Sequence, residues 1–372
     1  MEKNTASKAA RQKSRRLRRQ MATVLMIVAA LCLVIILAGK RETADVPDQY
    51  SEYEPYTYEG GSGQTFAMMG ENLVAASSTG LQLLNENGMT IQRQVFSLDQ
   101  PAIAVCSEVC AIYDIGGKTL RLCTADGEYT VADQEENIIR ADFGADGKLV
   151  VCTQETGYKG LAEVFDRDMN LLYRWHSGSG YLMDACLSDD GSLMAALCAA
   201  SEGGVVHIFS LAKDEELASY TADNELLLDV FFLNSTTICA ISSSQVRFLD
   251  TKGGLRSAYD FNGAYLTDYA CSGSGTLALY LSKYRSGSSG TLVTLRSTGE
   301  TIGEIDLERD FVSMSAGEKE FLVLYSDGLA RYSQSLDMTG HSDTIPSARR
   351  ALLCPDGQAL LLSTYSAEKY SF

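Results

Sequence analysis

Two short stretches of the sequence contain residue types that bind phosphate or calcium. Gly117-Lys118-Thr119 has the last residues of a phosphate-binding loop, but the first glycine of that motif would fall on Ile112, and no helix is expected after it. Asp166-x-Asp168-x-Asn170 starts like a calcium-binding loop, yet Leu171 and Ser177 stand where that loop needs its glycine and its bidentate glutamate. We therefore interpret both stretches as turns, and we expect no nucleotide, metal or other cofactor.

Histidines and serines lack the spacing that zinc binding or nucleophilic catalysis requires. His176, His207 and His341 lie far apart, and none has a second histidine one helical turn away. We interpret His207 as a half-buried, hydrogen-bonded residue of a strand. No serine stands in the Gly-x-Ser-x-Gly pattern of a nucleophile elbow. The sequence therefore predicts no catalytic residue and no metal ligand.

The ten cysteines do not indicate a disulfide framework. Cys32 lies in a long apolar run, the other nine are an odd number, and no Cys-x-x-Cys pair occurs. Most of them fall in apolar runs, where a thiol packs as a small apolar side chain. Cys106 and Cys110 flank one expected hairpin, and a disulfide between these two is left open.

Two stretches, 154–160 and 282–290, combine basic residues with tyrosines. Tyrosine and arginine are frequent anchors of protein interfaces, and basic residues are conspicuous in an acidic domain. We predict that these stretches form a partner-binding rim; the alternative is that both are ordinary solvated loops. The residues of this candidate rim are Tyr158, Lys159, Lys283, Tyr284 and Arg285.

The charge of the chain is unevenly distributed. The sequence has 31 Lys and Arg against 48 Asp and Glu, a net charge of −17. Residues 1–41 hold ten basic residues and one acid, which leaves 21 basic against 47 acidic residues, or −26, for the remainder. An acidic surface of this size repels phosphate groups, so we exclude nucleic acid as a partner.

A hydrophobic segment follows the basic start of the chain. Residues 21–39 contain no charged side chain, and at ~1.5 Å per residue a helix of this length spans the ~30 Å apolar core of a bilayer. Eight basic residues precede it, which by the positive-inside rule places residues 1–20 in the cytoplasm. We predict a single-pass signal-anchor in the cell membrane, with the rest of the chain extracytoplasmic. A cleaved signal peptide is the alternative, but the apolar run is longer than usual and Lys40-Arg41 follows it.

Beyond an acidic tether at 40–63, short apolar runs recur that are typical of strands, without a helical period. The spacings between the starts of successive runs lie between 36 and 44 residues and average about 41. This is the ~40–45-residue period of a four-stranded propeller blade. The runs start at Leu73, Val109, Leu149, Leu193, Thr237, Leu277, Phe321 and Ala359.

Eight such units predict an all-β, eight-bladed β-propeller over residues 64–372, with seven blades as the fallback. The last unit has room for only three strands before Phe372. The alternating stretch Glu54-Pro-Tyr56-Thr-Tyr58 is expected to supply the missing outermost strand near 54–58 and to close the ring. In such a ring the second-to-third and fourth-to-first connections share one face, so the two candidate loops should share that face, in units three and six.

The repeat period and the Asp-Gly turns, such as Asp190-Gly191, resemble the WD-repeat and YVTN-like β-propellers of bacterial envelope proteins. The Trp-Asp pair of true WD repeats is absent, and Trp175 is the only tryptophan. Together with the basic tail and single anchor, the layout resembles a family of unknown function that comprises single-pass, propeller-bearing proteins of Gram-positive bacteria. The resemblance implies a membrane location and no established activity.

Two classes of function remain. The first is a non-catalytic, membrane-anchored platform for protein interaction or ligand binding, whose rim loops bind an envelope protein or a wall polymer. The second is an exported propeller enzyme, such as a polysaccharide lyase or hydrolase or a quinone-cofactor dehydrogenase, that uses channel carboxylates. The lack of a catalytic motif favours the first class. Two neighbouring carboxylates in a pocket at the channel mouth would favour the second.

Overall fold

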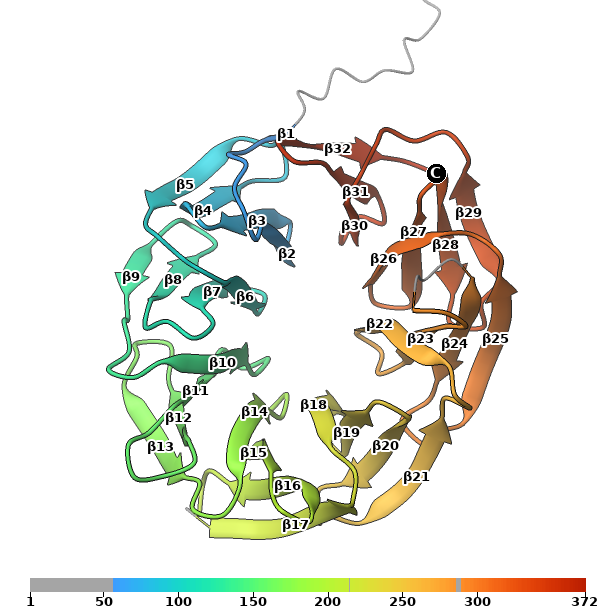
Figure 1. The fold of residues 1–372 in the computed structure, drawn as a ribbon. Helices are drawn as coiled ribbons and strands as arrows, with labels where there is room; N and C mark the ends of the chain where they lie inside the picture. The colour runs from blue at the N-terminus through green and yellow to red at the C-terminus, as the bar shows by residue number, and fades with distance from the viewer. Residues whose placement is uncertain (1–55, 214, 286–288) are drawn as a thin grey trace, which may run out of the picture. The chain divides into compact units, whose positions relative to one another are not determined.

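The computed structural model describes residues 56–213, 215–285 and 289–372. In this part of the chain, 32 strands form eight four-stranded antiparallel sheets, which Figure 1 shows as blades around a ring. The predicted all-β, eight-bladed propeller is thereby confirmed, and the seven-bladed fallback is wrong. The predicted tail 1–20, the span 21–39 and the tether up to residue 55 lie outside the described residues.

No helix among the described residues is both long and apolar enough to cross a bilayer.

Each of the first four blades consists of four consecutive strands, ordered from the centre of the ring outward (Figure 1). Blade 1 is β2 (Thr65–Met69), β3 (Asn72–Ser77), β4 (Gly80–Leu84) and β5 (Thr90–Val95); blade 2 is β6 (Pro101–Val105), β7 (Val109–Asp114), β8 (Leu120–Thr124) and β9 (Tyr129–Val131). Blade 3 is β10 (Ile138–Phe143), β11 (Leu149–Thr153), β12 (Leu161–Phe165) and β13 (Leu171–His176); blade 4 is β14 (Tyr181–Leu187), β15 (Leu193–Ala199), β16 (Gly203–Ser210) and β17 (Glu215–Asp223).

The next three blades repeat this order, and the eighth combines the two ends of the described chain. Blade 5 is β18 (Leu227–Asn234), β19 (Thr237–Ser242), β20 (Gln245–Asp250) and β21 (Leu255–Asp260); blade 6 is β22 (Tyr265–Cys271), β23 (Leu277–Ser282), β24 (Gly290–Leu295) and β25 (Thr301–Leu307). Blade 7 is β26 (Phe311–Ala316), β27 (Glu320–Tyr325), β28 (Gly328–Ser333) and β29 (Met338–Ser342); blade 8 is β30 (Arg350–Leu353), β31 (Ala359–Leu362), β32 (Ser366–Tyr370) and β1 (Tyr56–Thr57).

The second strand of each blade explains why the repeat is visible in the sequence. Every residue of β11, β19 and β23 is buried, because neighbouring blades cover both faces of these strands. A strand buried on both faces is a continuous apolar run. The outermost strands, by contrast, have one face in solvent, as the alternating exposure along β21 shows.

The antiparallel order gives the ring two different faces. One face carries the connections from first to second strand and from third to fourth strand, and we call it the turn face. Its connections are tight turns in which a short polar side chain binds the local backbone. Asp250, for example, accepts hydrogen bonds from the N–H groups of Lys252 and Gly254, both at 2.8 Å. Gly191 follows Asp190 in such a turn with φ of 60°, a conformation that favours glycine.

The two ends of the propeller meet in blade 8. β1 pairs antiparallel with β32, Tyr56 opposite Ala367 and Thr57 opposite Ser366, as the unfinished eighth unit predicts. The Tyr58 hydroxyl donates to the carbonyl oxygens of Ser363 and Ser366, at 2.9 and 2.7 Å. Tyr56 and Tyr58 are both buried, so a hydrophobic contact supports this closure.

All nine cysteines in the described part of the chain are free thiols. The disulfide that the sequence left open between Cys106 and Cys110 is therefore not formed. The reason is the hairpin register: Cys110 lies opposite Val105, and the Cys106 N–H bonds to the Val109 carbonyl. Side chains alternate between the faces of a sheet, so the two thiols point to opposite faces.

Candidate functional site

The face opposite the turn face gathers the exposed tyrosines. Each of them lies either in a second-to-third connection or at the first residue of an inner strand. No tyrosine with an exposed side chain lies on the turn face in the described residues. We call the opposite face the tyrosine face. Its tyrosines, with their exposed fractions, are Tyr158 (52%), Tyr181 (63%), Tyr265 (44%), Tyr284 (62%) and Tyr365 (67%).

Two of these tyrosines carry a cation on their rings. The Lys159 ammonium lies 4.4 Å from the ring centre of Tyr181 and donates to its hydroxyl at 3.1 Å. The Arg285 guanidinium carbon lies 5.5 Å from the ring centre of Tyr265. Neither cation belongs to an ion pair among the described residues. Each cation therefore has donors available for a bound anion.

Beside the first of these clusters, the tyrosine face has a hollow of about 500 Å³ between blades 3 and 4. We call it the blade 3–4 hollow. Most of its wall is apolar, and the wall combines a loop of blade 3 with the start of the inner strand of blade 4. It is lined by Ile139, Gln154, Glu155, Tyr158, Lys159, Tyr181, Leu182 and Met183.

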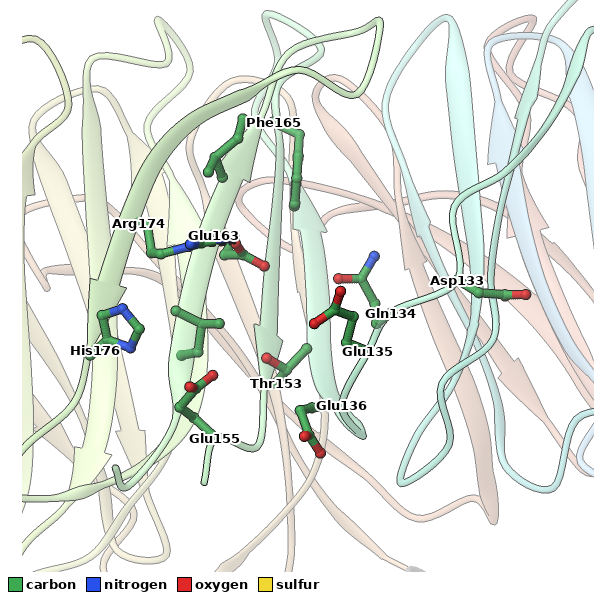
Figure 2. A pocket seen from close by; sticks show the side chains of 12 residues that line it. Asp133, Gln134, Glu135, Glu136, Thr153, Glu155, Glu163, Phe165, Arg174 and His176 are labelled. Atoms are coloured by element: carbon green, nitrogen blue, oxygen red, sulfur yellow. Dashed lines mark hydrogen bonds and ion pairs between the residues drawn. The ribbon is translucent and has the colours of Figure 1, made fainter. Parts of the chain in front are cut away.

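A second hollow of about 380 Å³ lies between the β9–β10 connection and strands β11 to β13 (Figure 2). Five carboxylates line it, and Figure 2 shows Glu163 beside Arg174, whose Nε donates to the carboxylate at 2.7 Å. His176 closes one side and packs on the Tyr158 ring with the ring centres 4.6 Å apart. Within the described chain, no three His, Cys, Asp or Glu side chains converge as a metal ion requires.

The channel wall has a repeated irregularity in five consecutive inner strands, β10, β14, β18, β22 and β26. The pairing register shifts near the start of each strand. Such bulges re-aim a side chain. The residues that follow the shifts are all polar: Arg140, Asp184, Asp229, Asp268 and Ser313.

Four side chains of this wall form one polar network across blades 3 to 6. Arg140 places Nε 3.4 Å from Asp184 Oδ1 and Nη2 3.6 Å from Asp229 Oδ2. The Tyr269 hydroxyl donates to Asp229 Oδ2 at 2.6 Å. Burial raises the pKa of Asp184 well above its ordinary value despite Arg140 nearby. Burial likewise raises the pKa of Asp142 to about 6. A raised pKa of this kind at Asp142 is suited to acid–base chemistry near neutral pH.

In blades 6 and 7, the residue that follows the register shift binds the inner strand of the next blade. Asp268 Oδ2 accepts the N–H of Met314 at 3.0 Å, and Ser313 Oγ accepts the N–H of Ala351 at 3.2 Å. Each contact joins one inner strand to the next. The ion pairs of Arg140 with Asp184 and Asp229 also join inner strands, and neither hollow described above is lined by Asp184 or Asp229.

The structure places all five predicted rim residues on the tyrosine face, but in two groups. Tyr158 and Lys159 belong to blade 3 and line the blade 3–4 hollow, whereas Lys283, Tyr284 and Arg285 belong to the β23–β24 connection of blade 6. Sequence reasoning missed Tyr181 and Tyr265, which begin inner strands after Ser-Gly or Asn-Gly loops, and Tyr365 in the β31–β32 connection. It also missed the repeated aspartates, which stand eight or nine residues before three of the aligned run starts: Asp184, Asp229 and Asp268 before Leu193, Thr237 and Leu277.

The phosphate-loop-like and calcium-loop-like stretches form connections between strands, and His207 lies in a strand, as the sequence predicts. Gly117-Lys118-Thr119 lies in the β7–β8 connection. Asp166 forms a local turn by accepting the N–H groups of Asp168 and Asn170. His207 lies in β16, half-buried, with Nδ1 2.8 Å from Glu216 Oε1.

Comparisons with known proteins agree with the fold and name no activity. The C-terminal WD40 domain of Sif2 matches with a TM-score of 0.59 and 10% identity, over 81% of this chain and 93% of that one. A chain of the mitotic checkpoint complex matches with a TM-score of 0.51 and 12% identity, over 71% of this chain and 88% of that one. At these identities the likeness shows the WD40-type propeller fold alone. No curated protein matches the sequence. Residues 46–341 match the family of unknown function DUF5711, and the chain therefore belongs to that family.

Proposed function

We propose that this protein is a non-catalytic, membrane-anchored platform that binds a partner protein outside the cytoplasm through its tyrosine face. The observation that carries the proposal is the distribution of the exposed tyrosines: all five lie on one face, and none in the described residues lies on the other. Random surface exposure gives no reason for such a bias, whereas a binding surface does.

The composition of the tyrosine face supports a protein partner. Tyrosine provides a large, rigid contact area at a low entropy cost, and serine and glycine provide adaptable hydrogen bonds. The loops beside the tyrosines have this composition, as in Ser177-Gly-Ser-Gly180 before Tyr181. A wall polymer built of hydroxyl and phosphate groups would have to desolvate those groups against the apolar wall of the blade 3–4 hollow, which is unfavourable.

The entry point of the chain supports the use of this face. Tyr56 lies at the turn-face end of β1, since its hydroxyl bonds to the Glu86 carbonyl in the β4–β5 turn. The described chain therefore enters the propeller at the turn face, opposite the tyrosine face.

The test replaces Lys283, Tyr284 and Arg285 together by Ala in the full-length chain and measures chemical cross-linking to partner proteins in native membranes. We expect at least about tenfold weaker capture, because desolvated Tyr and Arg anchors contribute ~2 kcal/mol or more each. The matched control replaces Glu318 and Lys319, in a turn-face connection, by Ala and should leave capture unchanged. Undiminished capture by the triple variant, with its melting temperature intact, would contradict the proposal.

The membrane location needs a separate test. Protease added to intact cells should digest or release the propeller, because the basic segment 1–20 is expected to remain inside. If the propeller is protected until the membrane is lysed, the proposed orientation is wrong.

A second candidate function, an exported enzyme, is favoured by the polar residues of the channel wall. The Arg140, Asp184 and Asp229 network places two carboxylates on one guanidinium at the channel wall. An enzyme of this type would release products from wall polysaccharide and lose that activity on Asp184→Asn substitution. Asp268 and Ser313 occupy the equivalent positions of later blades and join inner strands there. A structural role therefore accounts for polar residues at these positions without catalysis, and we place this candidate second.

A further inference from the structure

We infer that the blade 3–4 hollow is a subsite for one segment of the partner protein, in which a large apolar side chain stands next to a carboxylate. The inference rests on the proposed function and specifies the chemistry that the tyrosine face recognises. It concerns a different part of that face from the Lys283 to Arg285 loop used in the test above.

The size and lining of the hollow fit an apolar side chain. Its volume of about 500 Å³ falls within the ~300–1,000 Å³ range of ligand sites. Ile139, Leu182 and Met183 form its apolar wall, and Tyr158 and Tyr181 stand at its edge with more than half of each side chain exposed. Filling this hollow removes apolar surface from water, which stabilises the complex.

The charge in the hollow fits one carboxylate. Lys159 is held by the ring and the hydroxyl of Tyr181, and none of the ion pairs among the described residues involves it, although Glu155 also contributes to the wall. Arg309, a cation on the same face, is by contrast already paired with Asp327 and Asp343. A cation that is positioned but not neutralised favours an anionic group at that point.

A single positive charge also discriminates between anions. The described domain is strongly acidic outside such points, so a polymer with many negative charges would be repelled by the surrounding surface. One carboxylate beside an apolar side chain satisfies Lys159 and the apolar wall together. The partner is therefore a peptide segment of that composition rather than a polyanion.

The test uses small probes on the full-length protein in lipid nanodiscs, with empty nanodiscs measured in parallel. Ligand-observed NMR titrations compare N-acetyl-L-phenylalanine, its neutral amide and glycerol 3-phosphate. We expect the carboxylate probe to bind about threefold or more tightly than the amide, the size of a partly exposed charge contact. Glycerol 3-phosphate should bind more weakly than both.

Four variants locate the effect. Lys159→Gln should remove the preference for the carboxylate probe, and Lys159→Arg should retain it. Met183→Trp, which fills the hollow, should weaken both aromatic probes. Lys319→Gln, an exposed lysine on the turn face, should change nothing. Melting temperatures verify that every variant is folded.

The outcomes separate this inference from the proposed function. Failure of both aromatic probes to bind, equal binding of acid and amide, or a preference that survives Lys159→Gln would overturn the subsite. Tightest binding by glycerol 3-phosphate would overturn it in favour of a phosphate polymer. If the Lys283 to Arg285 variant still loses partner capture in those cases, the platform stands and only this subsite is wrong.

Discussion

The two faces of the ring differ in the exposed side chains that they carry: in the described part of the chain, the exposed tyrosines and two cations that rest on them lie on one face only. On the turn face, short polar side chains bind the local backbone. Asp190 accepts hydrogen bonds from Ser188 and Ser192, and these lower the pKa of its carboxyl. On the tyrosine face, Lys159 and Arg285 rest on tyrosine rings without a carboxylate partner among the described residues. These two cations of the tyrosine face keep donors that a ligand can use, unlike Arg309 of the same face, which Asp327 and Asp343 already pair.

This difference indicates a division of labour between stability and binding. Tight turns fix how each blade reverses direction, so their residues are constrained by backbone geometry. The connections of the tyrosine face include the longer loops 154–160 and 343–349, and loops commonly carry function on a rigid scaffold. Substitutions on the two faces should therefore change different measured quantities.

The largest expected effect compares a buried tyrosine with an exposed one in the same blade. Tyr58→Ala should lower the free energy of unfolding by ~3–5 kcal/mol, because it leaves a cavity and removes the bonds to Ser363 and Ser366 that close the ring. Tyr365→Ala should change it by less than ~0.5 kcal/mol, because that side chain is mostly exposed. Chemical unfolding followed by the fluorescence of Trp175 measures both. Similar losses for the two variants would mean that the exposed tyrosines also support the fold.

The next effect concerns the channel wall between the faces. Burial raises the pKa of Asp142 from 3.8 to about 6, so its stabilising neutral form is present below pH ~4 and is lost as the pH rises through about 6. Asp142→Asn should therefore match the wild type near pH 4 and be more stable by about 2–3 kcal/mol at pH 7.5, at ~1.36 kcal/mol per pKa unit. Unfolding curves at the two pH values check this. A stability difference that does not grow with pH would show that the pKa of Asp142 is not raised in the folded protein.

A smaller effect compares one glycine from each face. Gly191, on the turn face, has φ of 60°, and an added Cβ would lie 2.0 Å from Asp146 Oδ2. Gly191→Ala should therefore cost about 1 kcal/mol or more. Gly178, on the tyrosine face, has no atom within 4 Å of an added Cβ, so Gly178→Ala should change stability by less than ~0.5 kcal/mol. Thermal unfolding of the two variants measures the difference between these two positions.

The sequence predicts the fold because its strongest signal is local. Strands such as β11 and β23 are buried on both faces, so each blade repeats a continuous apolar run that a spacing test detects. The unfinished eighth unit likewise indicates the closing strand, which the pairing of Tyr56 with Ala367 confirms. The apolar pattern does not specify the register of the hairpin at Cys106, so it does not decide whether Cys106 and Cys110 form a disulfide.

The candidate site was only partly predictable because it combines neighbouring blades. Tyr158 and Lys159 are conspicuous in their own loop, but the wall that Tyr181 and Met183 add comes from the next blade. A hollow of this kind depends on how two blades pack, which residue types alone do not specify. The polar network also depends on how the blades pack, because Arg140 belongs to blade 3 and Asp229 to blade 5.

The smallest expected effect tests the comparison most directly. Single substitution of Tyr158, Tyr181, Tyr265, Tyr284 or Tyr365 by Ser should change the free energy of unfolding by less than ~0.5 kcal/mol, because these residues remain 44% to 67% exposed. Tyr181 is the most demanding case, since Lys159 donates to its hydroxyl; a contact between two exposed side chains contributes little to stability. Unfolding of each full-length variant, followed by Trp175 fluorescence, provides the measurement. A loss above about 1 kcal/mol at Tyr181 would assign that residue to the fold and remove it from the binding surface, and the contrast between the two faces would then rest on the other four tyrosines.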